Sequence, residues 1–191
     1  MDVMILPENL YFVDATIEDH FRAMSLIHAL GWRDTYVGYV PDEYMAREIT
    51  DTRWVNQFRE DYQTGRCRGL LLYRDSTPVA CVNYGPARTK NLNAGQPSSF
   101  PNDAYQGWGE IISFYTHPAE RGKGYGGLLF EEAVNRLKAA GHQNAFVFVL
   151  RENEKARRFY ARHGLAWDGT HADIPFPPDA VCVDLRYVKH L

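Results

Sequence analysis

Two hydrophobic periods alternate along the chain and predict a mixture of helices and strands. In residues 17–36, apolar side chains recur at helical spacing behind two acids, at Phe21, Met24, Ile27 and Leu30. The same pattern predicts helices over residues 17–36, 47–63, 125–141 and 153–164. Short runs rich in β-branched and aromatic residues predict strands over 10–16, 68–75, 79–85, 109–116, 144–150, 165–171 and 180–188. Residues 37–45, around Pro41, are predicted as a turn or loop.

The order of these elements, β-α-α-β-β-β-α-β-α-β-β, is that of a mixed α/β domain. The nearly continuous apolar run 144–150 is typical of a strand at the centre of a sheet. The chain has 191 residues, 45% hydrophobic and 24% charged, which is an ordinary globular composition. We therefore expect residues 1–191 to form a single domain.

Residues 86–109 interrupt this pattern with a long polar stretch rich in Pro, Gly, Asn and Ser. A loop of this length inside a compact domain is usually functional or mobile. We interpret it as an insertion between two strands rather than a linker between domains. The alternative is that this stretch is a disordered segment without a functional role.

Charge and cysteine content narrow the list of partners. The net charge of −3 gives no global attraction to nucleic acid or anionic lipid, so neither is expected as a partner. Cys67, Cys81 and Cys182 are too few and too scattered for a disulfide framework or a metal site, which favours a reducing compartment. The N-terminus lacks the features of a signal peptide, and no apolar run approaches the roughly 20 residues that cross a bilayer. We expect a cytoplasmic protein.

The most informative segment is residues 114–130, where a glycine-rich, basic turn joins a strand to a helix. Such a turn presents free backbone N–H groups at the helix N-terminus, where the helix dipole also favours an anion, typically a phosphate. Arg121 and Lys123 add positive charge. The glycines Gly122, Gly124, Gly126 and Gly127 therefore predict a phosphate-binding turn, although glycines can also open a helix merely for packing.

Two familiar phosphate-binding motifs fit this turn poorly. The P-loop pattern is absent. The dinucleotide pattern G-x-G-x-x-G is met literally by Gly122, Gly124 and Gly127, but it should follow the first strand of a βαβ unit and precede an acid at the end of the next strand. The acid after the next strand, Glu152, stands about 25 residues beyond the last glycine, somewhat farther than that motif requires. A nucleotide-binding oxidoreductase fragment stays open as a weak alternative.

Two patterns in the second half of the chain resemble those of the GCN5-related N-acetyltransferase (GNAT) superfamily. Residues 121–126 match its pattern Q/R-x-x-G-x-G/A. Farther on, a second pattern, N-x-x-A-x-x-F-Y-x-x-x-G, is matched by Asn153, Ala156, Phe159, Tyr160 and Gly164. The patterns occur in the family's order and on the expected elements, and the resemblance covers roughly residues 70–170. It implies a GNAT-type acyl-CoA N-acyltransferase fold, with a mixed central sheet of about seven strands flanked by about four helices.

The resemblance also implies acetyl-CoA as cosubstrate, bound where two parallel central strands, 109–116 and 144–150, separate. The pantetheine arm would follow the first of these strands and the pyrophosphate would lie on the amides of the turn. Asn153 would lie near the cofactor and also suits a helix N-cap. The cofactor-binding residues it implies are Phe114, Tyr115, Thr116, Arg121, Gly122, Lys123, Gly124, Tyr125, Gly126, Gly127, Asn153 and Arg158.

For catalysis, the resemblance implies that Tyr160 protonates the departing thiolate, although a tyrosine on this short helix also suits the core. An alkylamine with a pKa of about 10 must lose a proton before it attacks the thioester. Glu110, at the start of a central strand, is the candidate base, with a strand-end carboxylate in water as the plain alternative. A water relay, with or without His117, also remains open.

The predicted function is transfer of the acetyl group of acetyl-CoA to a primary amine of a small molecule or peptide. A GNAT-like module that binds acyl-CoA without transferring the acyl group is the alternative. Acids near the first helices would suit a cationic acceptor: Asp34, Asp42, Glu43 and Glu48. Aromatic candidates for the acceptor wall are Tyr36, Tyr39, Trp54 and Trp108. No metal is predicted, and a homodimer stays open.

Overall fold

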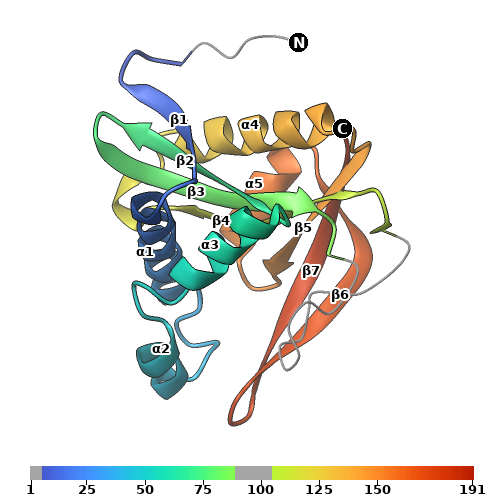
Figure 1. The fold of residues 1–191 in the computed structure, drawn as a ribbon. Helices are drawn as coiled ribbons and strands as arrows, with labels where there is room; N and C mark the ends of the chain where they lie inside the picture. Colours follow the sequence, from blue (N-terminus) through green and yellow to red (C-terminus); the bar gives the residue numbers. More distant parts are fainter. Residues whose placement is uncertain (1–5, 89–104) are drawn as a thin grey trace.

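The computed structural model describes residues 6–88 and 105–191, and most of the polar stretch 86–109 lies outside the described residues. A mixed seven-stranded sheet, in the order β1-β2-β3-β4-β5-β7-β6, organises the molecule (Figure 1). Its strands are β1 (Leu10–Asp14), β2 (Arg68–Arg74), β3 (Thr77–Pro86), β4 (Gly109–Thr116), β5 (Asn144–Leu150), β6 (Ala166–Phe176) and β7 (Ala180–His190). The predicted strands are all present, and β5 lies inside the sheet between β4 and β7, as its apolar sequence predicted.

The helices are α1 (Glu18–Thr35), α2 (Asp42–Glu48), α3 (Val55–Thr64), α4 (Tyr125–Ala139) and α5 (Glu154–Arg162), with a short 3-10 helix, η2 (Pro118–Glu120). The prediction was wrong around Pro41, where α2 replaces the expected loop. A proline with fixed φ followed by Asp42 and Glu43 is a good helix start, a signal that the sequence interpretation did not use. The predicted helix over 47–63 is accordingly shorter, because turns occupy residues 51–54 before α3 begins.

The sheet has an apolar core on each face, and strand alternation assigns residues to one or the other. On one face, Leu70 and Leu72 pack with residues of α4 such as Leu129 and Phe130. On the other face, Leu71 packs with residues of α1 and α3, among them Met24 and Phe58. The two layers of helices are visible in Figure 1, with α1 and α3 on one side of the sheet and α4 on the other.

The sheet divides at its centre. Strands β4 and β5 run parallel, but they pair only between residues 109–111 and 145–147. Beyond that point β4 remains paired with β3 up to Thr116, while β5 remains paired with β7 up to Leu150. The two strands therefore separate, and no strand of the described residues pairs with this edge of β4 from residue 112 onward.

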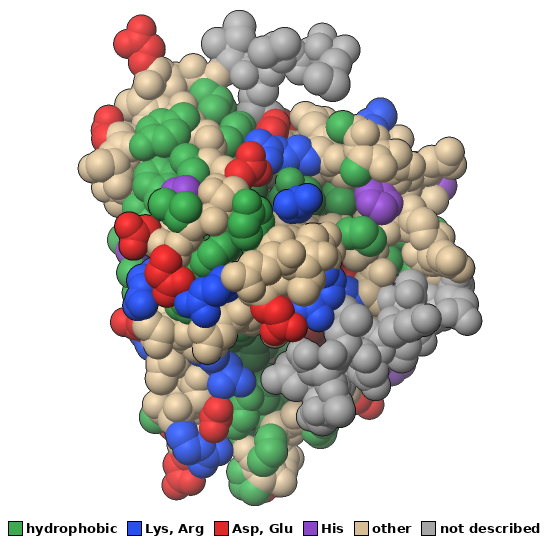
Figure 2. All heavy atoms as spheres, in the orientation of Figure 1, with side chains coloured by type: hydrophobic (Ala, Val, Ile, Leu, Met, Phe, Trp, Pro, Cys, Tyr) green, Lys and Arg blue, Asp and Glu red, His purple; other side chains and the backbone are tan. Residues whose placement is uncertain are grey.

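The outer surface carries charges of both signs. On the face shown in Figure 2, basic and acidic side chains are interspersed rather than gathered by sign. In the described part of the chain, no helix has the length and apolar character needed to cross a membrane.

Candidate acyl-transfer site

Two cavities adjoin where β4 and β5 separate. One has a volume of about 580 Å³ and lies between the sheet and helices α1 and α3. The other, of about 800 Å³, lies along the glycine turn and helix α5. We call them the acceptor cavity and the turn cavity. Residues common to both linings mark where they meet: Thr35, Phe114, Tyr115, Asn153, Ala156 and Tyr160.

The glycine turn presents bare backbone to the turn cavity. Gly122 and Gly124 adopt φ values of +80° and +83°, which favour glycine, and a Cβ at either would meet no atom within 4 Å. Helix α4 begins at Tyr125 without a side-chain cap. Its first-turn amides therefore have no capping partner among the described residues and suit an anion.

The three basic side chains that the sequence nominated in this region are paired with carboxylates. Arg121 forms an ion pair with Asp34 of α1, and Lys123 pairs with Glu120 at 2.9 Å. Arg158 pairs with Glu154 at 2.9 Å on α5. Arg121 and Arg158 line the turn cavity, whereas Lys123 does not. The sequence-predicted residues Phe114, Tyr115, Thr116, Tyr125, Gly126, Gly127 and Asn153 also line it.

Helix α5 places Tyr160 at the junction of the two cavities. Asn153 caps this helix, because its side-chain oxygen accepts a hydrogen bond of 3.0 Å from the backbone N–H of Ala156. Tyr160 is only 5% exposed, and burial raises the pKa of its hydroxyl well above the ordinary value. The hydroxyl is therefore protonated at neutral pH and can act as a donor.

The acceptor cavity has an aromatic wall. The ring of His28 stacks on Trp54 with centroids 4.0 Å apart, and the ring centroid of Tyr115 lies 4.5 Å from that of His28. Trp32 and Tyr36 stack at 4.3 Å. Burial lowers the pKa of His28 to about 3, so this histidine is neutral and behaves as part of the wall.

The opposite end of the acceptor cavity is polar, and its charges are paired. The Asp61 carboxylate accepts hydrogen bonds from Arg66 at 3.0 Å and from Gln57 at 3.0 Å. Arg53 pairs with Glu48 at 2.9 Å. Arg88, the third arginine of this lining, pairs with Glu110.

Glu110 is buried, with 2% exposure, and both of its oxygens are occupied. Arg88 donates from Nη2 to Oε1 at 2.6 Å, and from Nε and its backbone N–H to Oε2 at 3.1 and 3.0 Å. Glu110 lines neither described cavity, whereas Arg88 lines the acceptor cavity. The carboxylate that the sequence nominated as base is thus held inside an ion pair.

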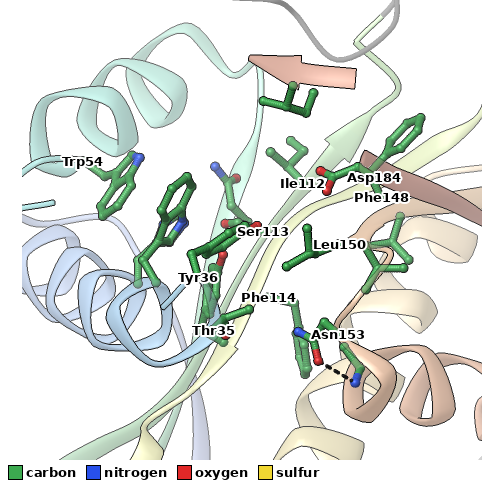
Figure 3. A pocket seen from close by; sticks show the side chains of 18 of the residues that line it. Thr35, Tyr36, Trp54, Ile112, Ser113, Phe114, Phe148, Leu150, Asn153 and Asp184 are labelled. Atoms are coloured by element: carbon green, nitrogen blue, oxygen red, sulfur yellow. Dashed lines mark hydrogen bonds between the residues drawn. The ribbon is translucent and has the colours of Figure 1, made fainter. Parts of the chain in front are cut away.

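Asp184 of β7 is a carboxylate that sequence interpretation missed. It lines the acceptor cavity, and Figure 3 shows it across the cavity from Trp54 and Tyr36, with its carboxylate directed inward. Its Oδ1 is buried without a hydrogen-bond partner among the described residues. Burial, reinforced by Glu152, raises the pKa of Asp184 to about 6. Only the alternation within "AVCVDLRYV", which sets an acid on an inward-facing position, hints at it.

The acids that the sequence suggested for the acceptor side lie elsewhere. Asp34 lines the turn cavity instead, and Asp42, Glu43 and Glu48 line neither cavity. Of the aromatic candidates, Tyr36 and Trp54 line the acceptor cavity, Tyr39 lines the turn cavity, and Trp108 lines neither. Among the described residues, no group of histidine, cysteine or acidic side chains has the arrangement of a metal site.

Comparison with known proteins identifies the class to which this fold and site belong. The model of the acetyltransferase (GNAT) family matches residues 31–165. The chain therefore belongs to the GNAT family, and the mixed sheet flanked by helices is the expected GNAT architecture. A comparison with curated proteins found no match.

Solved structures share this fold at low sequence identity. The PaiA N-acetyltransferase of Thermoplasma acidophilum, solved with coenzyme A, is 17% identical, with a TM-score of 0.69 over 95% of this chain and 99% of that one. A ribosomal-protein-alanine N-acetyltransferase from Brucella melitensis is 18% identical, with a TM-score of 0.68 over 95% and 99%. The acetyltransferase yncA of Salmonella typhimurium, solved with acetyl-CoA, is 13% identical, with a TM-score of 0.67 over 96% and 95%.

Proposed function

We propose that this protein is an N-acetyltransferase that moves the acetyl group of acetyl-CoA to a primary amine of a small molecule or peptide. The observation that carries the proposal is the meeting of two cavities at Tyr160, one beside bare turn amides and one beside an aromatic wall. With acetyl-CoA in the turn cavity and the amine in the acceptor cavity, the thioester and the amine nitrogen would meet where the two cavities join. Family membership and similar structures that hold coenzyme A or acetyl-CoA support it.

The turn cavity suits acetyl-CoA because it offers hydrogen-bond donors to the phosphates. The amides of residues 122–127 would hold the pyrophosphate, and Arg121 and Arg158 lie near enough to the cavity to add positive charge. The unpaired edge of β4, at Phe114 and Thr116, offers backbone groups to the amides of the pantetheine arm. When bound there, acetyl-CoA supplies an activated acetyl group.

Tyr160 is the proposed acid. The raised pKa of Tyr160 means that a free phenolate is unfavourable, so the hydroxyl protonates the thiolate only if it regains a proton in the same event. The amine nitrogen, which carries an excess proton after attack, is the proton source on the other side of the junction. Tyr160 would thus pass a proton from nitrogen to sulfur.

Glu110 remains a proposal for the base, but the structure sets a condition on it. Its carboxylate would have to leave Arg88 before it could accept a proton from an amine in the acceptor cavity. A water relay along β4 is the other route considered for this step. Neither route uses Asp184.

The experiment is a thiol-release assay with acetyl-CoA and a panel of primary amines, alongside calorimetric titration with coenzyme A. We expect micromolar-to-millimolar binding of coenzyme A and amine-dependent thiol release. Binding of coenzyme A with no turnover on any amine would favour the second candidate, a module that binds acyl-CoA without transfer. Binding of NAD instead of coenzyme A would reject both.

We also propose that residues 1–191 act as one domain in the cytoplasm, as the composition suggested. Size-exclusion chromatography with light scattering would show whether the active form is a monomer or a homodimer.

A further inference from the structure

Resting on the proposed function, we infer that the acceptor is a monoamine on an apolar body, and that Asp184 binds its ammonium group and accepts its first proton. The inference starts from the placement of one carboxylate in the acceptor cavity. Asp184 comes from β7, opposite Leu150 of β5 and Ala172 of β6, and faces the space opened by the separation of β4 and β5.

Asp184 lacks the partners that satisfy the other buried carboxylates. Asp61 is held by Arg66 and Glu110 by Arg88, with ion-pair distances of 2.8 and 2.6 Å. No described residue forms an ion pair or hydrogen bond with the side chain of Asp184, and its Oδ1 is buried. Leaving a buried carboxylate oxygen unpaired is unfavourable, so this position is ready for a cation that the free chain does not supply.

Arg186, on the same face of β7, is paired with Asp168, and the other titratable groups around Asp184 in the described part of the chain supply no positive charge. Those that interact with it electrostatically are Glu152 beyond β5, Tyr36 beyond α1, Tyr115 on β4 and Cys182 on β7. All of them are neutral or negative in the physiological range. An ammonium group is therefore favoured at Asp184, and a carboxylate or phosphate is excluded.

The remainder of the cavity limits what the ammonium group can be attached to. The wall of Trp54, neutral His28 and Tyr115 is a stack of aromatic rings without a charge of its own, which suits an aromatic or other apolar body. At the far end the carboxylates of Asp61 and Glu110 are already paired with Arg66 and Arg88, so among the described residues no carboxylate there is left for a second ammonium group. A monoamine is thus favoured over a polyamine.

The proton balance follows from this placement. The bound ammonium gives one proton to the Asp184 carboxylate and becomes a free amine. Its nitrogen then attacks the thioester carbonyl, the new C–N bond forms and the C–S bond breaks. The second proton leaves the nitrogen and reaches the sulfur by way of Tyr160, while Asp184 releases the first proton to solvent. The products are the N-acetylated amine, coenzyme A as its thiol and one proton.

The test compares Asp184→Asn with wild type, using phenethylamine and its neutral counterpart 2-phenylethanol as probes. Asp173→Asn is the matched control, because Asp173 is an exposed carboxylate on β6 that lines neither cavity. Calorimetry on the protein saturated with coenzyme A should show that Asp184→Asn weakens phenethylamine binding by at least about tenfold, the low end for a hydrogen bond to a charged group. Binding of 2-phenylethanol should change less than about twofold, and wild type should bind spermidine more weakly than phenethylamine.

A kinetic arm adds a readout that a purely structural residue would not move. In wild type, kcat/KM for phenethylamine should rise with pH through about 6 as Asp184 ionises. In Asp184→Asn this acid limb should vanish and kcat/KM should fall by about a hundredfold or more. Asp173→Asn should keep both the limb and the rate.

The outcomes separate the two proposals. Wild type that binds phenethylamine but releases no thiol rejects acetyl transfer, and the binding arm still decides whether Asp184 holds the ammonium. Asp184→Asn that binds the amine as wild type does and keeps the acid limb overturns the inference while acetyl transfer stands. The inference is also overturned if Asp184→Asn weakens binding of phenethylamine and 2-phenylethanol equally. The same holds if wild type does not bind phenethylamine, or if it binds spermidine more tightly.

Discussion

The turn cavity and the acceptor cavity are built in different ways. The turn cavity is lined mainly by two short stretches, residues 114–127 and 152–163, and much of what it offers is backbone. The acceptor cavity draws its lining from three helices, α1, α3 and α5, and five strands, β3 to β7. A cavity made of local backbone suits a ligand part that does not vary, such as a diphosphate. In a cavity lined by side chains from distant parts of the chain, a few substitutions can change which ligand is bound.

The largest expected effect concerns the buried ion pair behind the acceptor cavity. Arg88→Met leaves the Glu110 carboxylate buried without its cation and should lower the free energy of unfolding by about 3 kcal/mol. We take the low end for a broken buried pair because the Arg88 side chain is 28% exposed. Urea denaturation measures the change.

The double variant Arg88→Met with Glu110→Leu provides the control, since it removes both charges. It should recover most of the lost stability. Thiol release by Glu110→Gln, measured in parallel, tests the alternative role: a loss of a hundredfold or more would return the base to Glu110.

The next effect concerns the junction. Tyr160→Phe keeps the ring and removes the hydroxyl, so turnover should fall by about a hundredfold while affinity for coenzyme A changes less than twofold. Tyr187→Phe is the matched control: this buried tyrosine lies 6.4 Å from the Tyr160 ring, accepts a hydrogen bond from Arg157, and lines neither cavity. Unchanged turnover in Tyr160→Phe would remove Tyr160 from the mechanism.

A third effect is on the pH dependence of stability. Because the folded-state pKa of Asp184 is about 6 and an unfolded aspartate titrates near 4, the folded chain holds the proton more tightly. Stability contributed by this protonation is present below about pH 4 and is lost as pH rises through about 6. Asp184→Asn should therefore raise the free energy of unfolding at pH 7 by about 1–2 kcal/mol, allowing for the partial exposure of the residue.

The same substitution should have little effect on stability at pH 4, where the wild-type carboxyl is largely protonated. Urea titrations at pH 4 and pH 7 measure both values. Equal changes at the two pH values would show that Asp184 is not a strained carboxylate in the folded chain.

The smallest effect concerns the turn. Gly124 has a φ of +83°, so Gly124→Ala should strain the turn by about 1 kcal/mol, redirect its amides and weaken coenzyme A binding by roughly tenfold. Gly141→Ala is the control at the other end of α4: its φ is +94° and its surroundings are equally open. It should lose similar stability and bind coenzyme A as wild type does.

Prediction from sequence succeeded where structure is determined locally. The bounds of β4 and β5 agree with the predicted strands, Phe21, Met24 and Ile27 are buried on α1 as their spacing predicted, and Asn153 caps α5. It failed at α2, where the signal was a proline followed by acids. On the proposed acceptor side, Asp42, Glu43 and Glu48 line neither cavity, and the sequence interpretation did not select Asp184, which lines one.

The sequence by itself determined the family, the order of elements and the glycine turn, because these depend on contiguous residues whose spacing and backbone freedom are visible in one dimension. Only the tertiary structure decided which carboxylates are free. Glu110 and Asp184 are both acids on central strands of the sheet, yet a partner 22 residues away occupies one and none of the described residues occupies the other. Charge pairing depends on which side chains the folded sheet brings together, and sequence separation does not reveal this.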